Sequence, residues 1–334
     1  MIAKFLDEKF EKSRNHPELS IVIVDSDSPD LTLNCLKSLY ENPPRREFEV
    51  ILVENESASN CARLVKDQHP SIRIIIAPQP QGFSKNYNLG IKQTDGDFVL
   101  ILNNDTIVHP GAFDALVDFI SDRPEFGIVG PKLLSMDGHI QTVCARPFIT
   151  PVSYVLIQFI LDLALPTGKM WDSYRRWRLS NAKSGSVPCL SGACMLIPRR
   201  VMNKVGILDE SYTFYYEDID WCRRVYNYGF QIGYVAEAEF THLGDQSLSR
   251  VKELAKQGEY RGAIRYFRQY HHLTKLGEFG LWTITLLSYA FRAAIYSFSG
   301  LNTGKHPYST SYRRLSQWII GEFPLFDKVI QTGK

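Results

Sequence analysis

The sequence lacks a hydrophobic segment long enough to cross a membrane. A spanning helix needs about 20 mostly apolar residues, and the two stretches that approach this length are interrupted by charge. Asp162 divides residues 152–165, and Arg292 divides residues 281–298. We therefore expect no transmembrane helix, which leaves peripheral contact as the form of membrane attachment to test.

Cysteine is scarce and shows none of the close spacings of a zinc or redox motif. The six cysteines of the 334-residue chain include no C-x-x-C pair. A chain of this length buries enough apolar surface to be stable without disulfides. Residues 1–17 are charged rather than apolar and so do not read as a secretory signal. We expect a cytoplasmic protein with reduced thiols.

Two glycine-rich nucleotide motifs are also missing. No G-x-G-x-x-G follows the first apolar run, and no G-x-x-x-x-G-K-[ST] occurs anywhere in the chain. These absences argue against a dinucleotide oxidoreductase and against a P-loop phosphotransferase. A diphosphate can instead be neutralised by a divalent cation, which requires oxygen ligands such as the Asp105 carboxylate.

The near-neutral net charge of +2 conceals an uneven distribution. Residues 250–334 carry 13 Lys and Arg against 5 Asp and Glu, whereas residues 1–249 carry 25 against 31. An acidic body argues against a nucleic-acid partner, whose binding face would be basic. The basic, aromatic tail can approach anionic lipid headgroups at the inner face of the cell membrane; a solvated tail face explains the charge equally well.

Apolar runs and helical periodicity alternate through the first 130 residues. This alternation predicts an α/β fold with a mostly parallel sheet covered by helices on both faces. Strands are expected at 19–25, 48–53, 72–76 and 98–102, and helices from Pro29 and at about 58–68, 85–92 and 111–121.

The second half is less regular. An apolar and aromatic insertion covers residues 148–177, a strand is expected at 193–197, and a helix begins near Asp218. The expected organisation is a lead-in, a nucleotide-binding half, an acceptor-side half and a helical tail. Their ranges are 1–18, 19–130, 131–249 and 250–334.

Polar clusters follow the expected parallel strands. Ligands collect outside the carboxyl ends of such strands, so these clusters are candidate site residues. Helix capping and turn formation explain any one of them equally well, but explain four less well. The clusters are Asp25-Ser26-Asp27-Ser28, Glu54-Asn55-Glu56-Ser57, Gln81 to Asn88, and Asn103-Asn104-Asp105.

Three carboxylates open the helix expected near Asp218. Glu217, Asp218 and Asp220 follow an aromatic pair that could limit water, as a general base requires. The helix dipole also favours acids at this position, so spacing alone leaves both interpretations open. His242 lies outside any periodic apolar segment, and on its own an isolated histidine is more often structural than a metal ligand.

Taken in order, these motifs resemble the family-two glycosyltransferases of the GT-A fold, in particular their rhamnosyltransferase-like branch. The resemblance covers residues 19–247. Besides the strand-end clusters and His242, it includes Gly82 to Gly90, Ser191-Gly192-Ala193, Leu208-Asp209-Glu210 and Phe214 to Cys222.

The resemblance implies an inverting sugar transfer from a dTDP- or UDP-sugar to a saccharide or lipid-linked saccharide, with Mg2+ or Mn2+. Asp218 would be the catalytic base beside Glu217, and Asp105 and His242 would hold the metal. Ser191, Gly192, Asp220 and Trp221 would lie on the acceptor side. The donor-binding residues would be Val24, Asp25, Asp27, Glu54, Gly82, Phe83, Lys85, Asn86, Asn103, Asn104 and Asp105.

Three positions depart from the family pattern. The first turn reads Asp25-Ser26-Asp27, Glu54 replaces the usual Asp, and Asn103 replaces the first acid of D-x-D. The base stays open between thymidine and uridine, with a weak preference for dTDP-rhamnose. Two other functions stay open: a sugar nucleotidyltransferase, and a non-catalytic carbohydrate-binding or scaffold protein. The tail aromatics could dock on a membrane, pack within the protein or form a homodimer; they are Trp282, Tyr289, Phe291, Tyr296 and Phe298.

Overall fold

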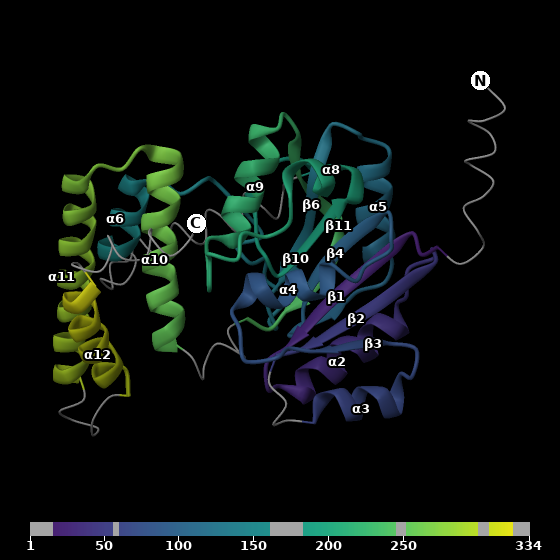
Figure 1. Ribbon diagram of the computed structural model, residues 1–334, viewed down its shortest axis with the longest axis horizontal. Helices are drawn as coiled ribbons and strands as arrows, with labels where there is room; N and C mark the ends of the chain where they lie inside the picture. The colour runs from purple at the N-terminus through teal and green to yellow at the C-terminus, as the bar shows by residue number, and fades with distance from the viewer. Residues whose placement is uncertain (1–15, 56–59, 161–182, 245–251, 300–306, 323–334) are drawn as a thin grey trace. The chain divides into compact units, whose positions relative to one another are not determined.

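The chain folds into two compact units. The computed structural model (Figure 1) describes residues 16–55, 60–160, 183–244, 252–299 and 307–322. Unit 1 comprises residues 1–148 and 175–250, and unit 2 comprises residues 149–174 and 251–334. Residues 1–15 of the lead-in predicted at 1–18, and residues 161–177 of the 148–177 insertion, lie outside the described residues.

Unit 1 is built on a mixed β-sheet. In its described part nine strands pair in the order β3-β2-β1-β4-β10-β6-β11-β5, with β8 beside β11, while β7 and β9 form a separate pair. Its elements are β1 (Leu19–Asp25), α2 (Pro29–Glu41), β2 (Phe48–Glu54), α3 (Cys61–Gln68), β3 (Arg73–Ile76), α4 (Phe83–Ile91), β4 (Phe98–Asn103), β5 (Thr106–Val108), α5 (Ala112–Ser121), β6 (Phe126–Leu134), β7 (Ala145–Arg146), β8 (Gly185–Ser186), β9 (Cys189–Leu190), β10 (Cys194–Pro198), α8 (Arg199–Val205), α9 (Glu217–Asn227) and β11 (Gln231–His242).

The alternation of side chains along β1 shows how the sheet is covered. Ile21 and Ile23 lie in one buried core with Leu36 of α2 and Leu116 of α5. Val22 points to the opposite face, where it meets α4. Because successive residues of a strand face opposite sides, the fully apolar run requires helices on both faces, and Figure 1 shows them there.

The expected parallel pairing is confirmed for four neighbouring strands at one end of the sheet. Strands β3, β2, β1 and β4 run parallel, whereas β10 joins β4 antiparallel. The predicted elements agree within one or two residues at most ends. The helix predicted from Lys85 begins at Phe83, and the residues proposed for the start of α3 at 58–59 lie outside the described residues.

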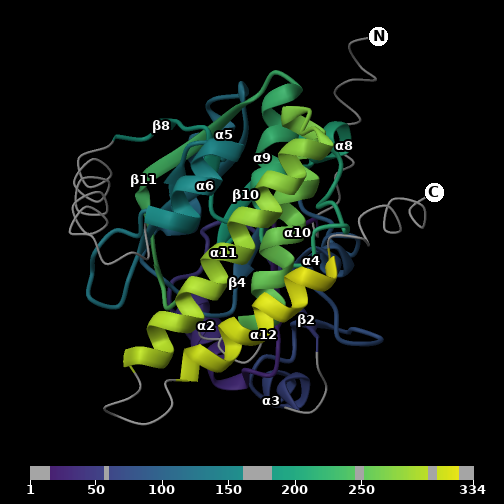
Figure 2. The same ribbon diagram turned by 90° about the vertical axis from the view of Figure 1, so that its left-hand side faces the viewer.

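Unit 2 is a group of helices, as the appendage prediction required. Figure 2 shows α11 and α12 running side by side. α6, from the insertion assigned by sequence to the acceptor-side half, groups instead with the tail because it packs against α11. The helices are α6 (Pro151–Ile160), α10 (Lys252–His271), α11 (Lys275–Ser299) and α12 (Pro307–Glu322).

Within the described ranges, none of the helices combines the length and the apolar character needed to cross a bilayer.

The contact between α4 and the sheet leaves no room for a side chain at Gly90. A Cβ there would lie 2.3 Å from Val22 Cγ1 and 3.1 Å from Val53 Cγ2. Gly90→Ala should therefore lower the free energy of unfolding by about 1–3 kcal/mol in urea denaturation. Gly185→Ala, where a Cβ meets nothing within 4 Å, is the control and should stay within about 0.5 kcal/mol. Equal stability of both variants would contradict the close packing.

Candidate active site

The register of the parallel strands brings the predicted polar turns to one edge of the sheet. Asp25 at the end of β1 pairs with Glu54 at the end of β2. Val24 pairs with Asn103 at the end of β4. The turns that follow these strands therefore lie side by side at the carboxyl edge, where α/β sheets bind ligands.

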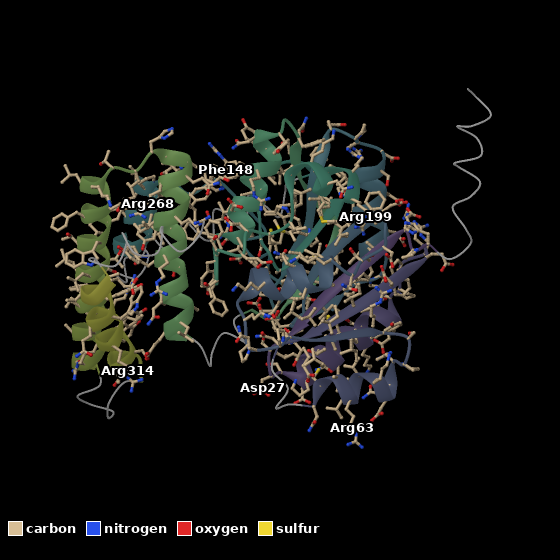
Figure 3. All side chains as sticks on the ribbon, in the orientation of Figure 1. Asp27, Arg63, Phe148, Arg199, Arg268 and Arg314 are labelled. Atoms are coloured by element: carbon tan, nitrogen blue, oxygen red, sulfur yellow. The ribbon has the colours of Figure 1, made fainter. Side chains whose placement is uncertain are left out.

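Asp25 braces this edge from within. Its Oδ1 accepts hydrogen bonds from Thr32 Oγ1 at 2.6 Å and from Asn104 Nδ2 at 3.3 Å, and the side chain is fully buried. Burial raises the pKa of Asp25, and these hydrogen bonds partly offset the rise. Asp25 Oδ1 and Asn104 therefore stabilise the turn, while Asp25 Oδ2 has no hydrogen-bond partner among the described residues. Contact of these two residues with a donor stays a prediction, as it does for the partly exposed Val24 and Asp27. Asp27, labelled in Figure 3, adopts a positive φ of 53°.

The second turn is tied to its neighbours by hydrogen bonds. Glu54 is buried, and its Oε1 accepts the Ala62 N–H at 3.3 Å in the first turn of α3. Asn55 donates to Ser26 Oγ at 3.2 Å and accepts the Gln81 N–H at 2.7 Å. Three loops of the predicted donor site thus form one connected rim.

The segment that opens α4 lies close to the chain before α9. A Cβ on Gly82 would lie 2.4 Å from Thr213 O, so only glycine fits, and the Phe83 N–H donates to the same oxygen at 3.0 Å. Asn86 is buried, with an Oδ1 that has no hydrogen-bond partner among the described residues, whereas Lys85 is exposed. Asn86 and Lys85 thus keep polar groups available to a ligand.

Asp105 and His242 meet across the pair formed by β5 and β11. His242 lies opposite Thr106, and the Leu243 N–H donates to Asp105 O at 2.9 Å. His242 Nε2 is 3.3 Å from Asp105 Oδ1, and Nδ1 is 2.9 Å from Gln141 Oε1. If Nδ1 donates to Gln141, Nε2 carries its lone pair toward the carboxylate, as a shared cation requires.

These two side chains fit a divalent cation. Asp105 is buried, yet its Oδ1 makes no hydrogen bond within the described residues, and an unpaired buried carboxylate oxygen is costly. No set of three potential ligand side chains converges in the described part of the chain, so ligands from outside the chain would complete the coordination of the cation. Asn103 Oδ1 instead accepts the Tyr87 hydroxyl at 3.1 Å, outside this pair.

Two acids begin α9 after an unusual turn. Tyr215 and Tyr216 both have a positive φ, 64° and 71°. Residues other than glycine rarely adopt this backbone conformation, and those that do cluster at functional sites. Tyr216 is buried and Tyr215 is exposed, so only one ring of the aromatic pair expected to limit water is shielded from solvent. Burial, and then the Asp218 charge, raise the pKa of Glu217 to about 8.

The loop between β9 and β10 connects the end of β4, which leads to Asp105, with Asp218 at the start of α9. The Gly192 N–H donates to Asp218 Oδ2 at 3.0 Å, and the Asn103 N–H donates to Ala193 O at 2.9 Å. A Cβ on Gly192 would lie 3.4 Å from both Asp218 Cβ and Phe83 Cζ. Adjacent residues of one loop thus contact Asp218 and the strand end that leads to the Asp105 turn.

Two residues predicted on the acceptor side are internal. Asp220 is fully buried and accepts from Arg224 Nε at 2.8 Å, while the fully buried Trp221 donates to Gly206 O at 3.0 Å. Their polar atoms hold α9 to the chain at the end of α8. Asp220 and Trp221 thus lie inside the fold, and the acceptor-side role of Ser191 and Gly192 stays a prediction.

Sequence reasoning missed the partners of the two central side chains. Arg146 Nη2 donates to Asp218 Oδ2 at 2.7 Å, and Gln141 orients His242. Both partners precede the second-half motifs, in a stretch with no periodic signal. A cation suits an ion pair with Asp218, and an amide suits a hydrogen bond to His242. No local sequence pattern, however, distinguished these two residues from other polar residues.

A sequence model described as "Glycosyltransferase like family 2" matches residues 16–259, which include both acidic sites. The chain belongs to glycosyltransferase-like family 2. Among curated relatives, N-acetylglucosaminyl-diphospho-decaprenol L-rhamnosyltransferase of Mycobacterium tuberculosis is 28% identical over 61% of this chain and 69% of its own length. O-antigen biosynthesis protein RfbC of Myxococcus xanthus is 28% identical over 74% of this chain and 19% of its own.

Solved structures show that this family-two chain has the GT-A fold. The mannosyltransferase PcManGT from Pyrobaculum calidifontis, in complex with GDP-Man and Mn2+, matches with a TM-score of 0.53 at 15% identity, over 98% of this chain and 94% of its own. GalNAc-T7 with UDP, GalNAc and Mn2+ matches with a TM-score of 0.51 at 16% identity, over 69% of this chain and 44% of its own.

Protonation of Glu217 should make stability depend on pH. Because burial raises its folded pKa from the ordinary 4.5 to about 8, the stabilisation is complete below pH 4.5 and is lost as pH rises through 8. The free energy of unfolding should fall over that interval by up to about 1.4 kcal/mol per pH unit. Urea unfolding from pH 5 to 9 should show a flatter curve for Glu217→Gln.

Glu41→Gln, at a side chain 61% exposed, is the matched control and should follow the parent curve. An equally steep curve for Glu217→Gln would contradict the protonated state of Glu217.

Proposed function

We propose that this protein is a metal-dependent, inverting glycosyltransferase in which Asp218 is the catalytic base. The observation that carries the proposal is the 191–193 loop, whose backbone contacts Asp218 on one side and Asn103 on the other. The base and the Asp105 turn are thereby held by one short segment. A donor bound at the strand ends and an acceptor near α9 can then meet.

The proposed reaction is a single displacement. Asp218 removes the proton of an acceptor hydroxyl as the oxygen bonds to the anomeric carbon, and the bond from that carbon to the diphosphate oxygen breaks. The electron pair leaves with the nucleoside diphosphate, and the proton stays on Asp218. One displacement inverts the anomeric configuration. The buried, protonated Glu217 leaves the charge of the pair on Asp218.

Asp105 and His242 would hold Mg2+ or Mn2+. When bound, the cation neutralises charge on the departing diphosphate. Gln141 fixes the His242 ring through Nδ1, and Asn86 offers polar atoms to the donor near the start of α4.

The donor and acceptor classes follow from the relatives. The M. tuberculosis protein is named for rhamnose transfer to a diphospho-decaprenol-linked sugar, and the M. xanthus protein for O-antigen biosynthesis. These names support dTDP-rhamnose as the first donor to test, with UDP-sugars as alternatives. They also support a lipid-linked saccharide acceptor in surface polysaccharide synthesis.

Removal of the metal or of the base should abolish transfer, measured as nucleoside diphosphate release from each donor. Chelator should inactivate the parent, and Mg2+ or Mn2+ should restore it. Asp105→Ala should lose about a thousandfold in kcat/KM even with metal present, because it loses a carboxylate ligand. Asp218→Asn should lose roughly 10²–10⁴-fold.

Asp122→Asn, at an exposed position after α5, is the control and should match the parent. Parent-level transfer by Asp218→Asn would reject the base assignment, and activity unaffected by chelator would reject the metal.

The helical tail offers a surface for contact with the acceptor membrane. Leu276, Leu287, Phe291 and Ile295 of α11 are exposed, with Leu276 80% exposed. At this spacing they form one apolar stripe along the helix. By contrast, Trp282 donates to Ile319 O at 2.7 Å and Tyr289 is buried. Of the aromatics predicted to touch lipid, these two stabilise the helical unit instead, and Phe298 lies outside the described side chains.

The charge of the tail supports an anionic lipid surface as the partner. Every acidic residue between 252 and 322 lies in an ion pair, with Arg268–Glu278 among them (Arg268 is labelled in Figure 3). The remaining lysines and arginines leave this segment positive. We infer that the stripe of α11 inserts shallowly between headgroups while the basic groups contact their phosphates.

Co-flotation with vesicles of anionic phospholipid tests this contact. The double variant Leu287→Glu/Phe291→Glu should bind at least tenfold less than the parent, because both charges would enter the headgroup region. Met136→Glu, at an exposed side chain of unit 1, should float like the parent. Equal flotation of all three proteins would reject the contact, and a double variant that instead dissociates a dimer in gel filtration would assign the stripe to self-association.

A further inference from the structure

The contacts of Asp218 leave one of its two carboxylate oxygens able to accept a further hydrogen bond. Oδ2 accepts from Arg146 Nη2 at 2.7 Å and from the Gly192 N–H at 3.0 Å. Oδ1 accepts only the N–H of Ile219, its chain neighbour, at 2.8 Å, among the bonds of the described residues. A carboxylate oxygen offers about two lone-pair directions. Oδ2 is therefore saturated, and Oδ1 keeps one direction for an incoming hydroxyl.

Arg146 reaches Asp218 from an independent element. Arg146 lies on β7 opposite Cys189 of β9, and Gly192 follows β9 by two residues. The short β7–β9 pair thus carries both donors to Oδ2. Burial opposes the charge of Arg146, but Asp218, Cys189 and Cys222 together outweigh burial and raise the pKa of the guanidinium. Arg146 therefore stays charged throughout the accessible pH range.

The surroundings of Asp218 contain little other positive charge. Glu217 and Asp220 come from α9 itself, and Asp220 is paired with Arg224 at 2.8 Å. Cys189 of β9 and Cys222 of α9 are buried thiols, and burial raises the pKa of Cys222 well above its usual range. Among the described residues, no lysine or arginine other than Arg146 pairs with Asp218 or Glu217.

We propose that Arg146 is a positioning residue that balances the acidic charge at the start of α9 and holds the Asp218 carboxyl group so that Oδ1 faces the acceptor hydroxyl. The proposal rests on the proposed function, because it assumes that Asp218 is the base. Arg146 acts through Asp218 and touches no reacting atom. A purely structural ion pair would have the same distances, so the two roles must be separated by the pH dependence of the reaction.

The pH profile of kcat/KM for Arg146→Gln separates these roles. Without the cation, Asp218 beside Glu217 is protonated more easily. The acid limb should therefore move to higher pH by about one unit or more, with about tenfold lower rates on the acid side at an unchanged donor KM. Part of the loss should recover at high pH. Arg45→Gln removes the same charge at a side chain 75% exposed and should keep the parent profile.

Arg146→Lys tests the orientation separately from the charge. Lysine keeps the positive charge but lacks the planar fork of donors, so the acid limb should stay near that of the parent while kcat falls. Nucleoside diphosphate binding and the thermal unfolding midpoint verify that each variant is folded. If Arg146→Gln does not fold, parent-level kcat in Arg146→Lys overturns the positioning role.

Asp218→Asn in the same assay distinguishes two failures. An inactive Asp218→Asn together with a folded Arg146→Gln whose acid limb matches the parent overturns the positioning role and leaves the base assignment intact. An Asp218→Asn protein as active as the parent removes both.

Discussion

The site depends on the register between parallel strands β1, β2 and β4. Asp25 lies beside Glu54, and Val24 beside Asn103, so the turns after these strands end at one level. A slip of one residue would turn every side chain of a strand to the opposite face. Both faces of β1 are apolar, so the specific packing against the helices, such as the close approach of Val22 to Gly90, is what opposes such a slip. The register of these strands thus sets both the packing of the core and the geometry of the site.

Buried carboxylates meet different partners around this edge. One oxygen of Asp25 accepts from hydroxyl and amide donors, and one oxygen of Asp218 accepts from a guanidinium and a backbone N–H. Asp25 Oδ2 and Asp105 Oδ1 are buried without a hydrogen-bond partner among the described residues, and Asp105 Oδ1 lies 3.3 Å from His242 Nε2. An acid left unpaired by the fold points to a ligand that the chain itself does not supply. The chemistry assigned to each acid follows from its partner rather than from its residue type.

The tail shows how residue type can mislead. Aromatic side chains suggested lipid contact, yet Trp282 and Tyr289 face the other helices of unit 2. Large aromatic rings bury more apolar area than leucine does, so a small helical unit gains from placing Tyr289 in its interior. Phe291 instead remains on the surface of α11 with Leu276, Leu287 and Ile295.

The sequence by itself determined the elements of unit 1 and the order of its motifs. Strand alternation and helical periodicity are local properties, so β1, β2, β4 and the start of α2 were predicted almost to the residue, and the family resemblance was confirmed. The grouping of the polar turns at one edge of the sheet followed from the same prediction, because the carboxyl ends of parallel strands lie at the same edge.

Only the tertiary structure decided which polar residues share a partner. Arg146 lies 72 residues before Asp218, and Gln141 lies 101 residues before His242. It also separated the internal Asp220 from the neighbouring Asp218 and grouped α6 with the tail. Burial and ion pairing depend on which distant segments meet, and no pattern along a single chain carries that information.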